Sequence, residues 1–253
     1  MTEYFIYKVL LIIVFTSSFF IFIGLFFISA PYGKFFRKGW GITLNSKIGW
    51  LLMEFPSLAI MIILFIVGNK KASLFAFLFL LIWTSHYLHR TFIYPLKISK
   101  QNKKFPILIL FFALIFNFIN SYLNGRYLFY FSNKYYISWL HSLKFIIGIS
   151  IFIIGMIINI QSDYILLGLR KPGEQNYKIP AHGLFRFISS PNYLGEIMEW
   201  VGWAIMTWSL PGLSFAVFTI ANLLPRAYKN HKWYKKQFEN YPKNRKAIIP
   251  YIF

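Results

Sequence analysis

Two side chains inside apolar stretches of the chain could carry acid–base chemistry, Glu54 and Tyr87. A carboxylate at membrane depth is unfavourable unless it is paired or hydrated, so Glu54 is a candidate functional residue. The alternative is that Glu54 lies shallow and caps a helix near the interface. Tyr87 could donate a hydrogen bond to a substrate oxygen, with Glu54 orienting the phenol. On spacing alone, Tyr87 fits better as one of 17 tyrosines in an interfacial belt.

The remaining acids and histidines give a weaker signal for chemistry. Glu196 and Glu199 are three residues apart at a predicted helix start, where they could accept hydrogen bonds from the helix N-terminus or a ligand. The five histidines have no metal-binding spacing and the chain has no cysteine, so we expect no metal site. Glycine-rich phosphate-binding and Gly-x-Ser-x-Gly motifs are also missing, which argues against a Rossmann domain and a serine hydrolase.

The elements that position these residues are apolar helices. The chain is 57% hydrophobic and only 13% charged, against about 25% charged in soluble domains. Stretches long enough to span a membrane cover residues 9–30, 50–67, 72–94, 106–122 and 143–160. The last apolar block, 193–224, is long enough for a helix pair hinged near residues 210–212. These patterns predict an all-α, polytopic membrane protein with seven transmembrane helices, and a single domain over residues 1–253.

The charge pattern orients the predicted spans. Lysine and arginine number 27 against 7 acids, and they gather in the loops after the first, third and fifth spans and in the tail. The positive-inside rule then puts the N-terminus outside and the C-terminus in the cytoplasm. Basic loops between apolar runs fit anionic lipid headgroups or a phosphorylated ligand, and argue against nucleic acid. The same orientation places Glu54 and Tyr87 at similar depth on the cytoplasmic side, together with the polar segment 161–192.

Several ordered motifs resemble the steroid 5α-reductases. They are residues 54–57, 86–94, 159–166, 169–174, 177–180, 183–185, 192–200 and the ending 241–253. The similarity runs from about residue 32 to the end and is closest to the type 1 and type 2 animal enzymes. It implies a membrane oxidoreductase that uses NADPH to saturate the Δ4 double bond of a 3-oxo-steroid. Hydride would go to C5 and a proton to C4, while the 3-oxo group is polarised.

The resemblance also implies site residues. The family's carbonyl-facing tyrosine and its partner glutamate fall on Tyr87 and Glu54. Its cofactor positions fall on Tyr32, Asn159, Asp163, Arg170, Tyr177, Asn192, Glu196, Arg226, Asn230, Tyr234 and Arg245. Substrate contacts would come from Trp50, Glu54, Tyr87, Phe218 and Leu223.

The chain departs from the family pattern at three places. Asn230 stands where the family has a histidine, and Asn222 occupies an apolar-pocket position. The loop 97–105 is longer than in the animal type 2 enzyme, so its phosphate contacts do not transfer. These departures bear on steroid preference.

The implied partners are a steroid and the lipid bilayer, with no nucleic acid and no obligate protein partner. The membrane would be the endoplasmic reticulum in a eukaryote and the inner membrane in a bacterium.

Three other classes share parts of this pattern. A membrane methyltransferase using S-adenosylmethionine has a similar basic C-terminal region, but it has no need of Glu54, Tyr87 or the run 171–174. A polyprenol or enoyl reductase would belong to the same superfamily, and the length of the match disfavours it. A transporter or channel would distribute polar residues through several spans, whereas the intramembrane acids here cluster near one face.

Overall fold

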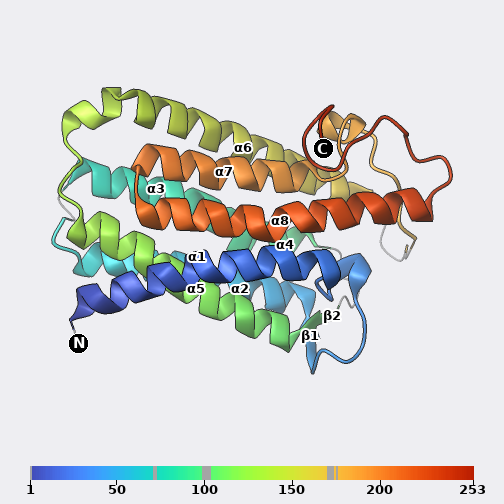
Figure 1. Ribbon diagram of the computed structural model, residues 1–253, viewed down its shortest axis with the longest axis horizontal. Helices are drawn as coiled ribbons and strands as arrows, with labels where there is room; N and C mark the ends of the chain where they lie inside the picture. The colour runs from blue at the N-terminus through green and yellow to red at the C-terminus, as the bar shows by residue number, and fades with distance from the viewer. Residues whose placement is uncertain (1, 71–72, 99–103, 170–173, 175) are drawn as a thin grey trace. The chain divides into compact units, whose positions relative to one another are not determined.

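The computed structural model describes residues 2–70, 73–98, 104–169, 174 and 176–253. The chain divides into two compact units, Met1–Leu11 with Ala30–Ser142 (unit 1) and Ile12–Ser29 with Leu143–Phe253 (unit 2). Within the described residues nearly all regular structure is helical, and the strands form one short antiparallel pair (Figure 1). The predicted all-α fold class is therefore confirmed.

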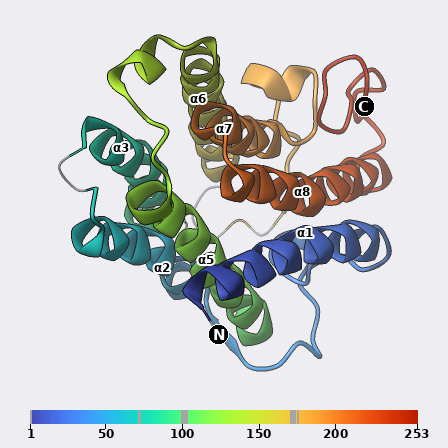
Figure 2. The same ribbon diagram turned by 60° about the vertical axis from the view of Figure 1, so that its left-hand side comes forward.

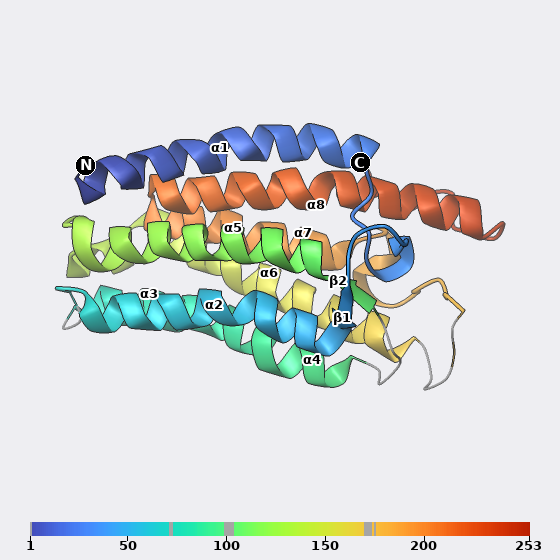
Figure 3. The ribbon, with the colours of Figure 1, turned by 90° about the horizontal axis from the view of Figure 1, so that it is seen from below.

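Unit 1 is built around a central helix, α2. Its regular elements are the start of α1 (Glu3–Phe27), η1 (Gly33–Phe35), β1 (Thr43–Asn45), α2 (Ser46–Val67), α3 (Leu74–Leu88), η2 (His89–Ile93), α4 (Tyr94–Lys97), β2 (Lys104–Pro106), α5 (Ile107–Arg126), η3 (Tyr127–Phe131) and η4 (Ile137–His141). α2 packs against both α3 and α5 (Figure 2). β1 pairs antiparallel with β2, so that Leu44 lies opposite Phe105, beside the start of α2 (Figure 3).

The third predicted span is one helical rod made of three pieces. α3 has only 15 residues, and a π-helical turn, η2, joins it to the short α4. A π turn closes its hydrogen bonds over one more residue than an α turn, and such turns are frequent at functional sites. α5 ends in a second π turn, η3. The α3–η2–α4 rod and α5 therefore each contain a π turn near one end, and this turn changes the direction in which the following side chains point.

Unit 2 contains the remainder of α1, α6 (Leu143–Gly168), η5 (Gly183–Arg186), α7 (Pro191–Thr207) and α8 (Leu210–Gln237). The last apolar block is thus two helices. The turn between them is at Trp208, which has a left-handed φ of 43°, and Ser209 caps α8 by accepting from Gly212 N at 3.1 Å. The break precedes residues 210–212 because Pro211 sits in the first turn of α8, where no amide hydrogen is needed.

α6 and α7 lie side by side in backbone contact (Figures 1 and 2). A Cβ added to Gly195 of α7 would lie 2.6 Å from Gly155 O and 2.5 Å from Asn159 N of α6. A Cβ on Gly202 would lie 2.6 Å from Gly148 O. Small residues at matching positions let two helix backbones approach closely, as in other membrane helix pairs.

Five helical segments of the described chain are long and apolar enough to cross a membrane, namely Glu3–Phe27, Ser46–Val67, Ile107–Phe131, Leu143–Gly168 and Leu210–Gln237. Large apolar side chains are exposed along them, as at Phe20 of α1 and Ile63 of α2. Water would not tolerate so much exposed apolar surface, whereas lipid does. The structure thus supports an integral, multi-pass membrane protein.

Candidate active site

Glu54 and Tyr87 lie at the same level of unit 1. The Trp83 Nε1–H donates to Ser57 O at 3.0 Å and ties α3 to α2. Glu54 is one turn before Ser57, and Tyr87 is one turn after Trp83. Because a short connection makes the two helices antiparallel, one turn back along α2 and one turn forward along α3 lead towards the same end of the unit. Both side chains are buried, so the predicted common depth has geometric support.

Arg90 is the cation beside Glu54. Its Nε lies 3.9 Å from Glu54 Oε1, and both side chains are buried. The guanidinium lies 4.6 Å from the ring centroid of Trp50 and 4.9 Å from that of Tyr94. The sequence places Arg90 in the cluster around Tyr87 but does not identify it as a partner of Glu54.

A polar stripe on α5, which the sequence analysis missed, faces the interior of unit 1. The Asn117 Nδ2–H donates to Met53 O at 2.7 Å, next to Glu54. Asn120, Ser121 and Asn124 continue the stripe and are at most 1% exposed. The sequence signal for these residues is their helical spacing within an apolar span. Polar residues at such positions bind neighbouring helices or ligands.

Tyr32 lies in unit 1, at the end that carries the strands. Its ring centroid is 5.8 Å from that of Phe105, which belongs to β2. A hollow of about 190 Å³ beside this strand is lined by Arg37, Lys38 and Lys104 among others. Burial lowers the pKa of Lys34 to about 7. An anion bound next to the Lys34 amine would raise this pKa again.

In unit 2, three of the predicted cofactor residues form one hydrogen-bonded chain. The Asn159 Nδ2–H of α6 donates to Asn192 O at 2.9 Å, and the Asn192 Nδ2–H donates to Asp163 Oδ1 at 3.1 Å. Asn159 and Asp163 are buried. Glu196 follows Asn192 by about one turn on α7 and is half-buried. The glycine contact of α6 and α7 lies within one turn of this chain and fixes its spacing.

α8 contributes the next predicted residues. Arg226 donates to Asn222 Oδ1 at 2.8 Å and to the Tyr193 hydroxyl at 3.3 Å. Asn222 therefore orients an arginine, which gives one structural reason for an amide at that position. The Asn230 Nδ2–H donates to Ser190 Oγ at 3.3 Å, just before α7.

The C-terminal tail folds back over α8 and brings Arg245 inside. Lys246 forms a parallel bridge with Ile188, and the rings of Tyr234 and Tyr241 stack at 5.4 Å. Arg245 is 4% exposed, and its Nε and Nη1 have no hydrogen-bond partner among the described residues. A buried, unsatisfied guanidinium is unfavourable unless an anion completes it.

A buried serine holds this tail, and the sequence analysis did not identify it. Ser189 Oγ lies 2.6 Å from His231 Nδ1 and 2.6 Å from the Tyr241 hydroxyl, and it also donates to Lys246 O at 3.0 Å. The tail is therefore anchored to α8 and to the segment before α7. This anchoring positions Arg245.

The other predicted residues are spread over both units. Trp50 lies under Arg90 in unit 1, while Phe218 and the buried Leu223 belong to α8 in unit 2. Tyr177 packs edge-on against Trp233 at 5.1 Å. Arg170 lies outside the described residues. Among the described residues, no group of three or more His, Asp or Glu side chains could hold a metal ion.

The two units thus carry complementary chemical groups. Unit 1 supplies a buried phenol, a carboxylate and an arginine, which can polarise a carbonyl oxygen. Unit 2 supplies amides, carboxylates and an uncompensated buried arginine, which suit the amide, hydroxyl and phosphate groups of a dinucleotide.

Comparisons with known proteins identify the family of the chain. The family profile described as 3-oxo-5-alpha-steroid 4-dehydrogenase matches residues 103–253. The steroid 5-alpha-reductase DET2 of Solanum lycopersicum is 47% identical over 231 residues, covering 90% of this chain and 89% of the relative. The corresponding protein of Gossypium hirsutum is 43% identical over 235 residues and 91% of each chain. The 3-oxo-5-alpha-steroid 4-dehydrogenase 2 of Homo sapiens is 44% identical over 213 residues, covering 83% and 82%.

Proposed function

Because the chain belongs to the family of 3-oxo-5-alpha-steroid 4-dehydrogenases, the steroid 5-alpha-reductases, we propose that it reduces 3-oxo-Δ4-steroids with NADPH. It is an oxidoreductase that saturates the Δ4 double bond. The relatives cover both units of the chain, and the observation that carries the chemistry is the buried set of Glu54, Arg90 and Tyr87.

Unit 1 stabilises the charge that develops on the steroid. As C5 accepts a hydride, the electrons of the double bond move towards C3 and its oxygen gains negative charge. The Tyr87 phenol donates its single O–H hydrogen bond to this oxygen, and Glu54, with Arg90 beside it, is the second group proposed to polarise the same oxygen. The enolate then takes a proton at C4, which completes the 5α-dihydro product.

Unit 2 fits the cofactor. Arg245 has unsatisfied buried donors that a phosphate would complete, and Arg226, held by Asn222 and Tyr193, is proposed as a second phosphate-binding arginine. The linked side chains of Asn159, Asn192 and Asp163 offer donors and acceptors for amide and hydroxyl groups. When bound, NADPH supplies the hydride. Tyr32, Tyr177, Glu196, Asn230 and Tyr234 complete the proposed cofactor set, with Arg170.

Trp50, Phe218 and Leu223 are proposed to contact the apolar steroid skeleton. They are aromatic or aliphatic, and the Trp50 ring is already fixed by the Arg90 guanidinium at 4.6 Å. A planar apolar ligand gains most from such rigid apolar surfaces.

The membrane arrangement proposed is seven spans with the N-terminus outside and the C-terminus in the cytoplasm. Five segments qualify by length and composition, and the α3–η2–α4 rod and α7 would supply the other two. The basic loops and tail support the orientation. The membrane would be that of the endoplasmic reticulum in a eukaryote or the inner membrane in a bacterium. A steroid could then enter from lipid while NADPH enters from water.

The purified full-length protein is expected to convert testosterone or progesterone to its 5α-dihydro product when NADPH is supplied. Product formation is followed by mass spectrometry, with S-adenosylmethionine in a parallel reaction as the cofactor of the rival methyltransferase class. A polyprenol and an enoyl thioester test the rival reductases. Absence of turnover with every 3-oxo-Δ4-steroid, or turnover with a rival pair instead, would contradict the proposal.

Arg245→Met is expected to weaken NADPH binding roughly 30-fold, because a buried charged contact to phosphate is lost. The ligand-free protein should not lose stability, since the variant removes a buried charge with unsatisfied donors. Equilibrium fluorescence titration gives the Kd, and thermal unfolding gives the stability. Lys243→Met, at an exposed position of the same tail, is the matched control and should bind NADPH like the wild type.

A further inference from the structure

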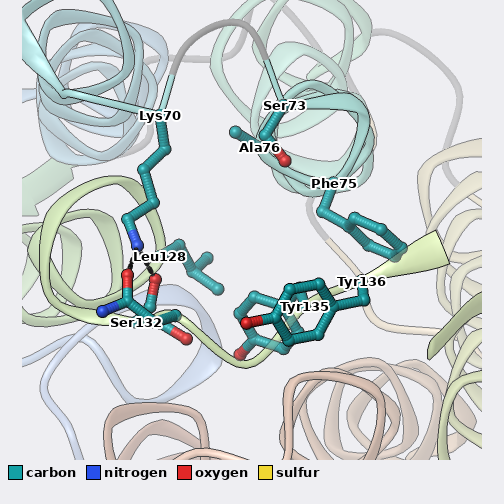
Figure 4. A pocket seen from close by; sticks show the side chains of 9 residues that line it. Lys70, Ser73, Phe75, Ala76, Leu128, Ser132, Tyr135 and Tyr136 are labelled. Atoms are coloured by element: carbon teal, nitrogen blue, oxygen red, sulfur yellow. Dashed lines mark hydrogen bonds between the residues drawn. The ribbon is translucent and has the colours of Figure 1, made fainter. Parts of the chain in front are cut away.

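Unit 1 contains a second cavity, far from the proposed reaction centre. It has a volume of about 380 Å³ and lies where α2 ends, α3 begins and the segment after η3 passes (Figure 4). Ala76 lines this cavity. At about 1.5 Å of rise per residue, Ala76 lies about 17 Å from Tyr87 along α3. The cavity is therefore separate from the Glu54–Tyr87 level of the same unit.

One wall of the cavity carries Lys70. The Lys70 ammonium donates to Ser132 O and Asn133 Oδ1, as Figure 4 shows. Among the residues that the structure describes, no carboxylate pairs with Lys70. The buried Ser132 hydroxyl lies beside the Tyr135 phenol on the lining of the same cavity. The cavity thus presents a positive charge and a hydroxyl, which an anionic oxygen would complete.

The opposite wall is aromatic. The rings of Phe75 and Tyr135 stack at 6.2 Å, and Phe79 meets Tyr135 edge-on at 5.0 Å. Tyr136 is 70% exposed and also lines the cavity. Two candidate spans end here, one at Val67 and the other at Phe131. Lysine and tyrosine at the ends of spans are typical of the headgroup level of a membrane.

Exposed apolar side chains lie at the same helix ends as the cavity-lining residues. Val67, Leu74 and Phe77 are 65%, 48% and 48% exposed, and they flank Lys70 in the sequence. A ligand with a charged head and an apolar tail could use both features. A free inorganic anion would use only the charged part of the site.

The geometry points to a binding site for the phosphate headgroup of an anionic phospholipid, held by Lys70 and the Ser132–Asn133 wall. Its acyl chains run along the exposed apolar side chains of α2 and α3. This site is distinct from the steroid-reducing residues, so its occupancy can be measured independently of the reaction.

The test uses the full-length protein in neutral detergent and compares phosphatidylglycerol with phosphatidylcholine of identical acyl chains. Native mass spectrometry counts the bound lipids and gives their Kd. We expect tighter binding of phosphatidylglycerol, and Lys70→Gln should weaken that binding about fivefold. Lys8→Gln removes the same charge from an exposed position of unit 1 that does not line the cavity, and it should change the Kd less than about twofold.

A second variant covers the case in which Lys70→Gln does not fold, because Lys70 also ties Ser132 to the end of α2. Tyr136→Glu adds a negative charge at an exposed rim position and should also weaken phosphatidylglycerol binding. Equal affinity for the two lipids, or an equal loss in Lys8→Gln, overturns the inference. Full displacement of the lipid by inorganic phosphate would instead assign the cavity to a free anion and also overturn it.

Discussion

Tyr87→Phe is expected to lower steroid turnover roughly 100- to 1000-fold, because it removes one preorganised hydrogen-bond donor to the developing oxyanion. The phenyl ring keeps the packing against Trp83, whose ring centroid is 5.1 Å away. Only the hydroxyl is lost, so the fold should persist. The measurement is kcat with saturating NADPH, together with the Kd of NADPH.

The Kd is the informative control for Tyr87→Phe, because unit 2 carries most of the proposed cofactor residues. It should stay within about twofold of the wild-type value, since the lost interaction belongs to the oxyanion alone. Tyr130→Phe, at an exposed position of unit 1, should leave both quantities unchanged. Unchanged turnover in Tyr87→Phe would remove Tyr87 from the mechanism, and a parallel loss of NADPH affinity would point to a folding defect.

Gly195→Ala is expected to have the largest effect on stability of any single-methyl addition proposed here. The added Cβ would meet Asn159 N at 2.5 Å and Gly155 O at 2.6 Å, and both are backbone atoms that cannot rotate away. Overpacking of this kind costs roughly 1–3 kcal/mol, which lowers the apparent Tm by roughly 2–12 °C for a chain of this size. NADPH affinity should fall as well, because Asn159 and Asn192 separate.

Gly168→Ala on α6 is the matched control for Gly195→Ala. A Cβ at Gly168 meets nothing within 4 Å, so the same chemical change is free of clash. Alanine is the better helix former, so this variant should be neutral or slightly more stable. Thermal unfolding in detergent compares the two variants. Equal melting temperatures would show that the glycine contact between α6 and α7 does not limit stability.

The helices were predictable from the sequence because long apolar runs have few alternatives in a membrane. Each predicted apolar block overlaps helical structure in the described chain, although the third consists of three helical pieces and the last of two helices. The ends were less predictable. The turn at Trp208 requires a left-handed backbone, and a tryptophan gives no sequence signal for one. Pro211, near which the hinge was predicted, lies in the first turn of α8.

The candidate site was predictable in part. The predicted span directions placed Glu54 and Tyr87 at similar depth, whereas the role of Tyr87 and the cofactor residues came from the family resemblance. Partners such as Arg90 for Glu54 depend on tertiary contacts that spacing does not reveal. The same holds for Ser189, which meets His231 and Tyr241 across more than 40 residues of chain.

The π turn at His89–Ile93 bears on how this chain should be compared with its relatives. A π turn arises when one residue is inserted into an α-helix without breaking it. A homologous chain that lacks the turn would be one residue shorter between Tyr87 and the end of α4. An alignment that moved this gap into the following loop would displace the residues after the π turn, such as Tyr94, by one position. Such a gap would belong inside the helix.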